Sequence, residues 1–260
     1  MLCTIGIIYY KTLYINIRYI SMTKEFDLNV PVDISGMTLQ QYQKYLKLYD
    51  KWDKEDENYI KAKMLQIFCG LTAEQTYELP LSSFDTIISH LIESLQQETP
   101  MIDRFTMFGK DKNGDDIEVV FGFIPELDKM SFGEFIDLSN YINDWSNMHK
   151  AMAVLFRPTV VNKKTVYDIE KYQGSFKYAD VMLDMPLNVA LGAMVFFYRL
   201  MSKLPKLTID YLQKVKDSKK SSPLKTILEK DGDTINRFTR YVKEMSQESM
   251  KLQVPIYIDV

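Results

Sequence analysis

The chain has 260 residues, enough for one large domain or two small ones with a substantial buried core. Hydrophobic residues make up 46% and charged residues 26% of the sequence, a composition that is too apolar for a disordered chain. The net charge of -3 provides no overall attraction to nucleic acid or to an anionic membrane. Only 10 glycines are present beside 15 methionines, which favours helices over a turn-rich β-sandwich.

Residues 1–21 form an unusual segment that is rich in isoleucine and tyrosine and contains no acidic residue. Its longest apolar run, residues 7–10, is too short for a signal peptide or for a membrane span of roughly 20 residues. Met22 is followed by a stretch that resembles an ordinary protein start. We therefore interpret residues 1–21 either as an extension upstream of the true start or as a strand-forming arm. An ordered arm is expected to pair with a neighbouring subunit.

Residues 22–100 are predicted to form an N-terminal helical unit. Apolar residues recur at three- and four-residue steps over residues 39–52, which is the spacing of one helix face. A second helix is expected over about residues 58–68, and a longer one is expected to start at Ser82 or Ser83.

Two pairs of residues have the spacing of a helix capping box. Thr72 stands three residues before Gln75, and Ser131 stands three residues before Glu134. In a capping box each of the two side chains bonds to the backbone amide of the other residue, which satisfies amides that a helix start leaves unpaired. We predict helix starts directly after Thr72 and Ser131.

Residues 101–125 are predicted to form a β-hairpin. Two short runs of aromatic and β-branched residues, 105–108 and 117–123, flank a polar loop that contains Asn113 and Gly114. Asn-Gly between two such runs is a strong hairpin signal because both residues accept the positive φ of a tight hairpin turn.

Residues 126–204 are predicted to be a central helical core. A helix over about residues 145–156 is expected to end before Pro158, and residues 187–203 are expected to form a buried central helix. Residues 205–260 are predicted to contain a basic connector, C-terminal helices and a terminal strand. The expected fold class is mainly α with a small β-hairpin (α+β), a multi-helix globular domain with strand-forming terminal arms.

No catalytic, cofactor-binding or metal-binding residue is assigned from the sequence. Phosphate-loop and hydrolase signatures are missing, and the two cysteines and two histidines lack the spacing of metal ligands. We therefore expect a protein that is not an enzyme. The competing hypothesis is an unrecognised enzyme centred on His149, Trp145 and Arg157, which requires these three side chains to share a concave pocket.

Four aromatic residues on the first long helix exceed what a narrow core stripe requires. They belong either to the core or to a protein interface. If they form an interface, replacing two of them with serine should break assembly without unfolding the chain. These candidate interface residues are Tyr42, Tyr45, Tyr49 and Trp52.

Residues 199–225 carry eight lysines and arginines but only two acidic residues. This basic segment is interpreted as a solvated connector, as a contact with an acidic protein surface, or as a nucleic-acid contact. Nucleic acid is the least favoured of the three, because one aromatic residue makes a poor platform for stacking bases. The weak candidates for contacts with an anionic partner are Lys214, Lys216, Lys219 and Lys220.

Three stretches of sequence, read together, carry a resemblance to a known group of proteins. They are FIPELDKMSFGEFIDL at residues 123–138, NMHKAMAVLFRP at 147–158 and DMPLNVALGAMVFFY at 184–198. These stretches resemble structural and assembly proteins of tailed bacteriophages, including those of crAss-like phages of Bacteroidetes hosts. Residues 71–95 are also similar to the helical region of phage tail assembly chaperones, so the resemblance covers roughly residues 71–203.

This resemblance implies a non-enzymatic virion protein of the tail or neck, or its assembly factor, acting by protein–protein interaction. The implied partners are other phage structural proteins, in a homo-oligomer or a ring within a larger assembly. The implied location is the virion, or the host cytoplasm during assembly, with no cofactor, membrane span or nucleic-acid partner. The alternatives are a packaged cargo protein ejected into the host, a tail assembly chaperone absent from the virion, and an enzyme or nucleic-acid binder.

Overall fold

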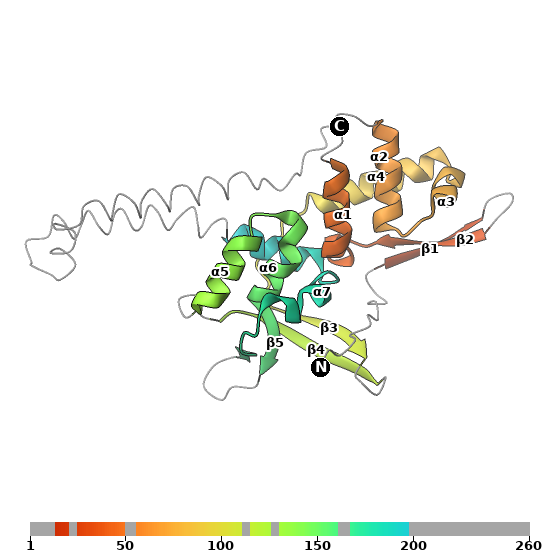
Figure 1. Ribbon diagram of the computed structural model, residues 1–260. Helices are drawn as coiled ribbons and strands as arrows, with labels where there is room; N and C mark the ends of the chain where they lie inside the picture. The colour runs from red at the N-terminus through yellow and green to blue at the C-terminus, as the bar shows by residue number, and fades with distance from the viewer. Residues whose placement is uncertain are drawn as a thin grey trace, which may run out of the picture. The chain divides into compact units, whose positions relative to one another are not determined.

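The computed structural model describes residues 14–20, 25–49, 56–110, 115–125, 130–160 and 167–197 (Figure 1). The chain divides into two compact units, one formed by Met1–Gly192 with Pro255–Val260 and the other by Ala193–Val254. The elements that carry the site described below all belong to the first unit.

The described residues form helices joined to two small antiparallel sheets, which confirms the predicted mainly helical α+β class. The strands are β1 (Tyr14–Ile20), β2 (Glu25–Pro31), β3 (Arg104–Lys110), β4 (Asp116–Phe123), β5 (Phe156–Val160) and β6 (Asp168–Ile169). The α-helices are α1 (Leu39–Tyr49), α2 (Glu57–Phe68), α3 (Ala73–Glu78), α4 (Leu81–Leu95), α5 (Phe132–Tyr141), α6 (Met148–Leu155) and α7 (Ala179–Met182), followed by helical residues 187–197.

Both predicted capping boxes are confirmed, at the start of α3 and at the start of α5. The helix α2 ends where Gly70 takes a φ of 71°, a left-handed conformation that glycine adopts without steric cost. The helix α4 begins one residue earlier than predicted, at Leu81, because the extended Pro80 serves as its N-cap.

The predicted hairpin is confirmed as β3 and β4, which pair antiparallel with Phe105 opposite Phe121. The two rings stack with their centroids 5.6 Å apart, and this cross-strand aromatic pair stabilises the register. The loop with Asn113 and Gly114 lies outside the described residues. The sheet continues beyond the hairpin, in the order β3-β4-β5-β6.

The strand β5 was not predicted, because Pro158 was interpreted only as the end of a helix. The structure corrects this: α6 ends at Leu155, and the chain turns directly into a strand that pairs with both β4 and β6. Pro158 has no N–H to donate, but its carbonyl accepts a hydrogen bond from the amide of Glu170. The proline therefore fits within the sheet.

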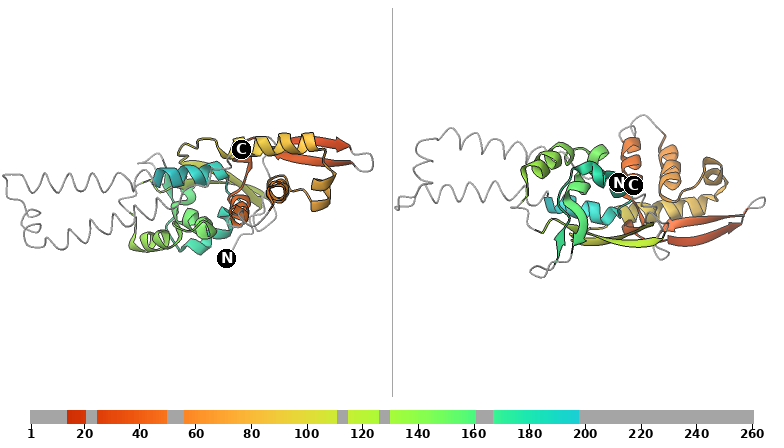
Figure 2. Two further views of the ribbon diagram at one scale, coloured as in Figure 1. Left: turned by 90° about the horizontal axis from the view of Figure 1, so that it is seen from above. Right: turned by 60° about the horizontal axis from the view of Figure 1, so that its bottom comes forward.

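The strand β1 lies in the segment that was predicted to be an extension or an arm pairing with a neighbouring subunit. In the structure β1 pairs antiparallel with β2 of its own chain along seven residue pairs, a partner that the sequence analysis did not expect. Figure 2 shows α4 alongside this hairpin, and a ring nitrogen of His90 lies 2.8 Å from the carbonyl oxygen of Pro31. His90 therefore helps to join α4 to β2.

The core of the first unit is built around α6, in which six of eight residues are buried. Backbone hydrogen bonds join the residues around the start of α1 to residues 185–187. The amide of Leu39 donates to the carbonyl oxygen of Met185, and the amide of Leu187 donates to the carbonyl oxygen of Met37. These bonds connect segments that are far apart in the sequence. The predicted burial of the helix from residue 187 is confirmed for residues 187 and 189–191.

Candidate functional site

Two of the four aromatic residues that the sequence assigned either to the core or to an interface, Tyr42 and Tyr45, face the core. Tyr42 and Tyr45 each expose only 2% of their surface, so neither can be an exposed binding residue in the folded chain. The ring of Tyr42 packs edge-on against Trp145, and the ring of Tyr45 packs against Phe68. The side chain of Tyr49 and all of Trp52 lie outside the described residues, as do Lys214, Lys216, Lys219 and Lys220.

The three residues of the enzyme hypothesis fall into two separate networks. Gln43 joins two of them: its side-chain amide donates to the carbonyl oxygen of Trp145 and lies 3.2 Å from Nδ1 of His149. Arg157 instead forms an ion pair with Glu134. Nothing in the described geometry gathers all three side chains around one point where a substrate would react.

His149 provides a stability prediction. Burial is the largest influence on its pKa and lowers it below the ordinary value of 6.5, with Lys150 acting in the same direction. The folded chain therefore binds fewer protons at this site than the unfolded chain does. We expect the free energy of unfolding to fall as pH drops through 6.5, and the loss to be complete below the folded-state pKa. Urea titrations between pH 8 and 5 measure this slope, which should be shallower in His149→Gln.

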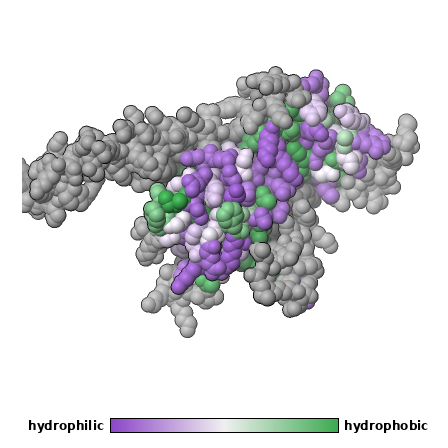
Figure 3. Space-filling model, in the orientation of Figure 1, coloured by the Kyte–Doolittle hydropathy of each residue, from purple (hydrophilic) through white to green (hydrophobic). Residues whose placement is uncertain are grey.

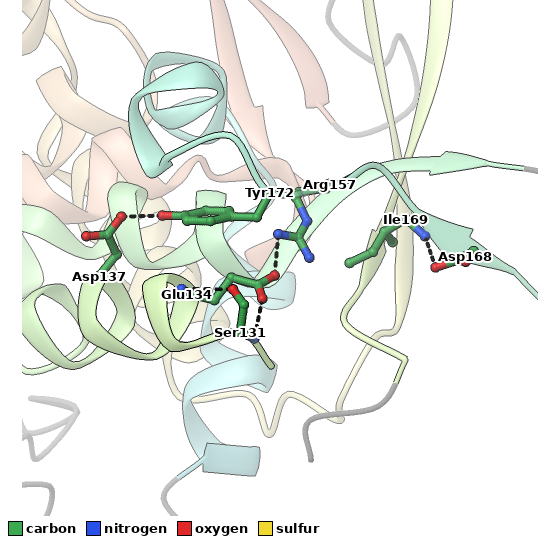
Figure 4. Close-up of polar contacts among 7 residues, drawn as sticks. All are labelled: Ser131, Glu134, Asp137, Arg157, Asp168, Ile169 and Tyr172. Carbon is green, nitrogen blue, oxygen red and sulfur yellow. Dashed lines mark hydrogen bonds and ion pairs between the residues drawn. The ribbon is translucent and has the colours of Figure 1, made fainter. Parts of the chain in front are cut away.

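The inner face of α5 is held by a buried ion pair (Figure 4). Nη1 of Arg157, on β5, lies 2.5 Å from Oε1 of Glu134, and both side chains are almost fully buried. The other carboxylate oxygen of Glu134 accepts the backbone amide of Ser131 at 2.6 Å. Burial alone would raise the pKa of Glu134, but hydrogen bonds from Ser131 and Arg157 outweigh burial and hold the pKa below its ordinary value.

A second polar contact holds the same face of α5 one turn further along. The hydroxyl of Tyr172 donates to the carboxylate of Asp137, and burial together with this bond raises the pKa of the Tyr172 hydroxyl. The guanidinium of Arg157 lies over the ring of Tyr172, 5.3 Å from its centroid. Glu134 and Asp137 are three residues apart, so both acidic side chains point from α5 toward the body of the unit (Figure 4).

The outer face of α5 is apolar and exposed. Phe132 exposes 80% of its surface, Phe135 42% and Ile136 40%. Their i, i+3, i+4 spacing places them on one side of the helix, opposite the buried Glu134 and Leu138. Figure 3 shows this hydrophobic patch over α5. The helix therefore reverses the usual pattern, with its acidic residues inward and its phenylalanines outward.

The exposed apolar area on α5 amounts to roughly 300 Å², taking about 200 Å² for each large side chain. Single exposed apolar residues are ordinary, but three on one helix face form a patch of a size that marks binding sites. A stable interface needs about 800 Å² per partner, so this patch would form the centre of a larger contact. Sequence reasoning missed the patch. A usable signal was the acidic Glu134 between Phe132 and Phe135, directly after a capping box, because it shows that the two phenylalanines and the carboxylate lie on different sides of the helix.

Among the described residues, no three His, Cys, Asp or Glu side chains are grouped so that they could hold a metal ion. Cys69 is buried with a free thiol, and burial raises the pKa of this thiol to about 12. Within the same part of the chain, every helix is too short or too polar to cross a bilayer. In comparisons with protein-family models, curated proteins and solved structures, no match to this chain is found.

Proposed function

We propose that this chain is a non-enzymatic protein of a tailed bacteriophage, built into the tail or neck or acting as its assembly factor. It works by protein–protein interaction through the outer face of α5. The binding role rests on three exposed apolar side chains of α5, Phe132, Phe135 and Ile136. The opposite face of this helix is held by the buried ion pair between Glu134 and Arg157. The phage assignment rests on the sequence resemblance at residues 123–138, 147–158 and 184–198.

The rigid inner face of α5 supports this proposal physically. A binding helix that is fixed before it meets its partner loses less conformational entropy on association than a mobile one. The Glu134–Arg157 ion pair and the Tyr172–Asp137 hydrogen bond fix α5 from the inside. The exposed rings of Phe132 and Phe135 are rigid and apolar, as binding anchors are.

The virion component, the assembly factor and the packaged cargo protein are separated by one measurement on purified particles. Quantitative mass spectrometry should find a structural component at a fixed copy number. A tail assembly chaperone should be absent from the particles but present in infected cells. A cargo protein should be present in intact particles and lost from particles that have ejected their contents.

Replacing Phe132 and Phe135 with serine should abolish assembly while leaving the chain folded. Both side chains are exposed, so the free energy of unfolding should change by less than about 1 kcal/mol. Loss of two binding anchors should weaken the contact by about thirtyfold or more. The measurement is the copy number of the tagged variant in particles or, for an assembly factor, its affinity for a purified tail protein.

The control for this pair is Phe176→Ser, which removes a ring outside α5 whose exposed fraction, 72%, lies between those of Phe135 and Phe132. The control variant should bind like the wild type. Equal binding by the Phe132→Ser, Phe135→Ser double variant and the wild type would show that α5 does not form the interface.

A further inference from the structure

Along the ten described residues of α5, the outer face of the helix carries no charge. The helix contains two charged residues, Glu134 and Asp137, and both point inward (Figure 4). Glu134 forms the ion pair with Arg157, and Asp137 accepts the hydroxyl of Tyr172. The side chains that α5 exposes are therefore all uncharged: Phe132, Phe135, Ile136 and Asn140.

Other long helices of the first unit do expose charged side chains. Lys44 is exposed on α1, Glu57 on α2 and Asp85 on α4. Two different proteins commonly meet through opposite charges, whereas a two-fold contact between identical copies brings a side chain near its own counterpart. A charged face would repel itself in such a contact, and the uncharged face of α5 does not. The charge pattern of these described helices therefore favours a second copy as the partner of α5.

The arrangement of large and small residues on α5 also fits a second copy. Ile136 lies near the middle of the helix, one turn after Phe132 and three residues before Ser139. In an antiparallel pair centred on Ile136, Phe132 of each helix lies opposite Ser139 and Asn140 of the other. The small side chain of Ser139 leaves room for the ring. A Cβ added at Gly133, beside Phe132, would meet nothing within 4 Å, so the backbone there is open to a close approach.

We propose that the outer face of α5 binds the same face of a second copy, in an antiparallel helix pair about a two-fold axis near Ile136. The inference rests on the proposed binding role of this face and names its partner. The apolar surface removed from water is roughly 600 Å² in total, taking roughly 300 Å² from each copy. A contact of this size is weak, so the dimer should dissociate with a Kd on the order of 10 µM.

The first experiment places like or opposite charges at the two-fold axis of the full-length chain, with mass in solution measured by light scattering. The wild type should be a dimer at about 200 µM and mostly a monomer at about 1 µM. Ile136→Lys and Ile136→Glu should each associate at least about tenfold more weakly, because like charges then meet. An equimolar mixture of the two variants should recover association, because lysine then meets glutamate across the axis.

A matched control and the salt dependence separate the α5 contact from other kinds of association. Leu81→Lys places the same charge on an exposed apolar residue of α4 and should associate like the wild type. Wild-type association should not weaken between about 50 and 500 mM salt, because no ion pair holds the proposed contact. Circular dichroism should show that every variant is folded.

Chemical cross-linking tests the same geometry with a milder substitution. In a Cys3→Ser background, Ile136→Cys should give a covalent dimer with a short bismaleimide, and the buried Cys69 should not react. Asn143→Cys should give no covalent dimer, because a position seven residues from the axis lies about 20 Å from its counterpart in an antiparallel pair.

A wild-type chain that stays monomeric at about 200 µM would overturn the inference. A mixture of folded Ile136→Lys and Ile136→Glu chains that stays dissociated would also overturn it, as would equal cross-linking at positions 136 and 143. None of these results would exclude a different protein as the partner of α5. The copy number of the Phe132→Ser, Phe135→Ser variant in particles tests that broader proposal separately.

Discussion

Replacing Arg157 with leucine should lower the free energy of unfolding by about 3–5 kcal/mol, because it leaves the buried carboxylate of Glu134 without its countercharge. The hydrogen bonds to this carboxylate that would remain come from Ser131, whose backbone amide donates to it at 2.6 Å. The side chain of Arg157 also covers the ring of Tyr172, so part of the loss comes from packing. Urea unfolding at neutral pH measures the change.

Two comparisons isolate the contribution of the ion pair. Adding Glu134→Gln to Arg157→Leu should recover part of the loss, because a neutral amide can remain buried and still accept the Ser131 amide. Glu57 and Lys61 form an ion pair of similar length, 2.6 Å, on the exposed side of α2. Lys61→Leu should change stability by less than about 1 kcal/mol. Equal losses of unfolding free energy in Arg157→Leu and Lys61→Leu would show that burial does not determine how much the Arg157–Glu134 ion pair contributes to stability.

Replacing Tyr45 with serine should unfold or strongly destabilise the chain, by about 3–5 kcal/mol. A buried aromatic ring removed from the core leaves a cavity as well as lost contacts with Phe68 and Tyr42. If the aromatic residues of this helix formed an interface, replacing Tyr45 and Tyr49 with serine would instead break assembly in a folded chain, so the core and interface hypotheses predict opposite effects on stability. Thermal and urea unfolding distinguish them.

Tyr77→Ser provides the matched control, because it makes the same chemical change at a side chain that is exposed on α3. Its effect on the free energy of unfolding should stay within about 0.5 kcal/mol. If Tyr45→Ser were as mild as this control, Tyr45 would not be a core residue.

Local signals in the sequence predicted much of the fold. The capping boxes at Thr72 and Ser131 specify hydrogen bonds over three residues, and both are formed in the structure. The β3–β4 hairpin was predicted from two runs of aromatic and β-branched residues on either side of Asn113 and Gly114. These features depend on nearby residues only, which is why a single sequence contains them.

Features that depend on distant partners were missed. Pro158 made a strand unlikely from the sequence alone, because proline lacks an N–H to donate. In the structure β5 pairs with β4 on one side, and on the other side the amide of Glu170 donates to the carbonyl oxygen of Pro158. The aromatic residues of α1 could not be assigned to core or surface, because Trp145 and Phe68 lie elsewhere in the sequence. Likewise, the buried side of α5 is decided by Arg157, which follows Glu134 by 23 residues.

The most direct test of the α5 interface is site-specific photo-cross-linking. A photoreactive amino acid at position 132 should form a product with a tail or neck protein, or with another copy, in assembling particles. Mass spectrometry of that product should identify the partner peptide. The same group at position 118, on the exposed side of β4, should form little product. Equal or no cross-linking at position 132 would contradict the claim that α5 presents a protein-binding face.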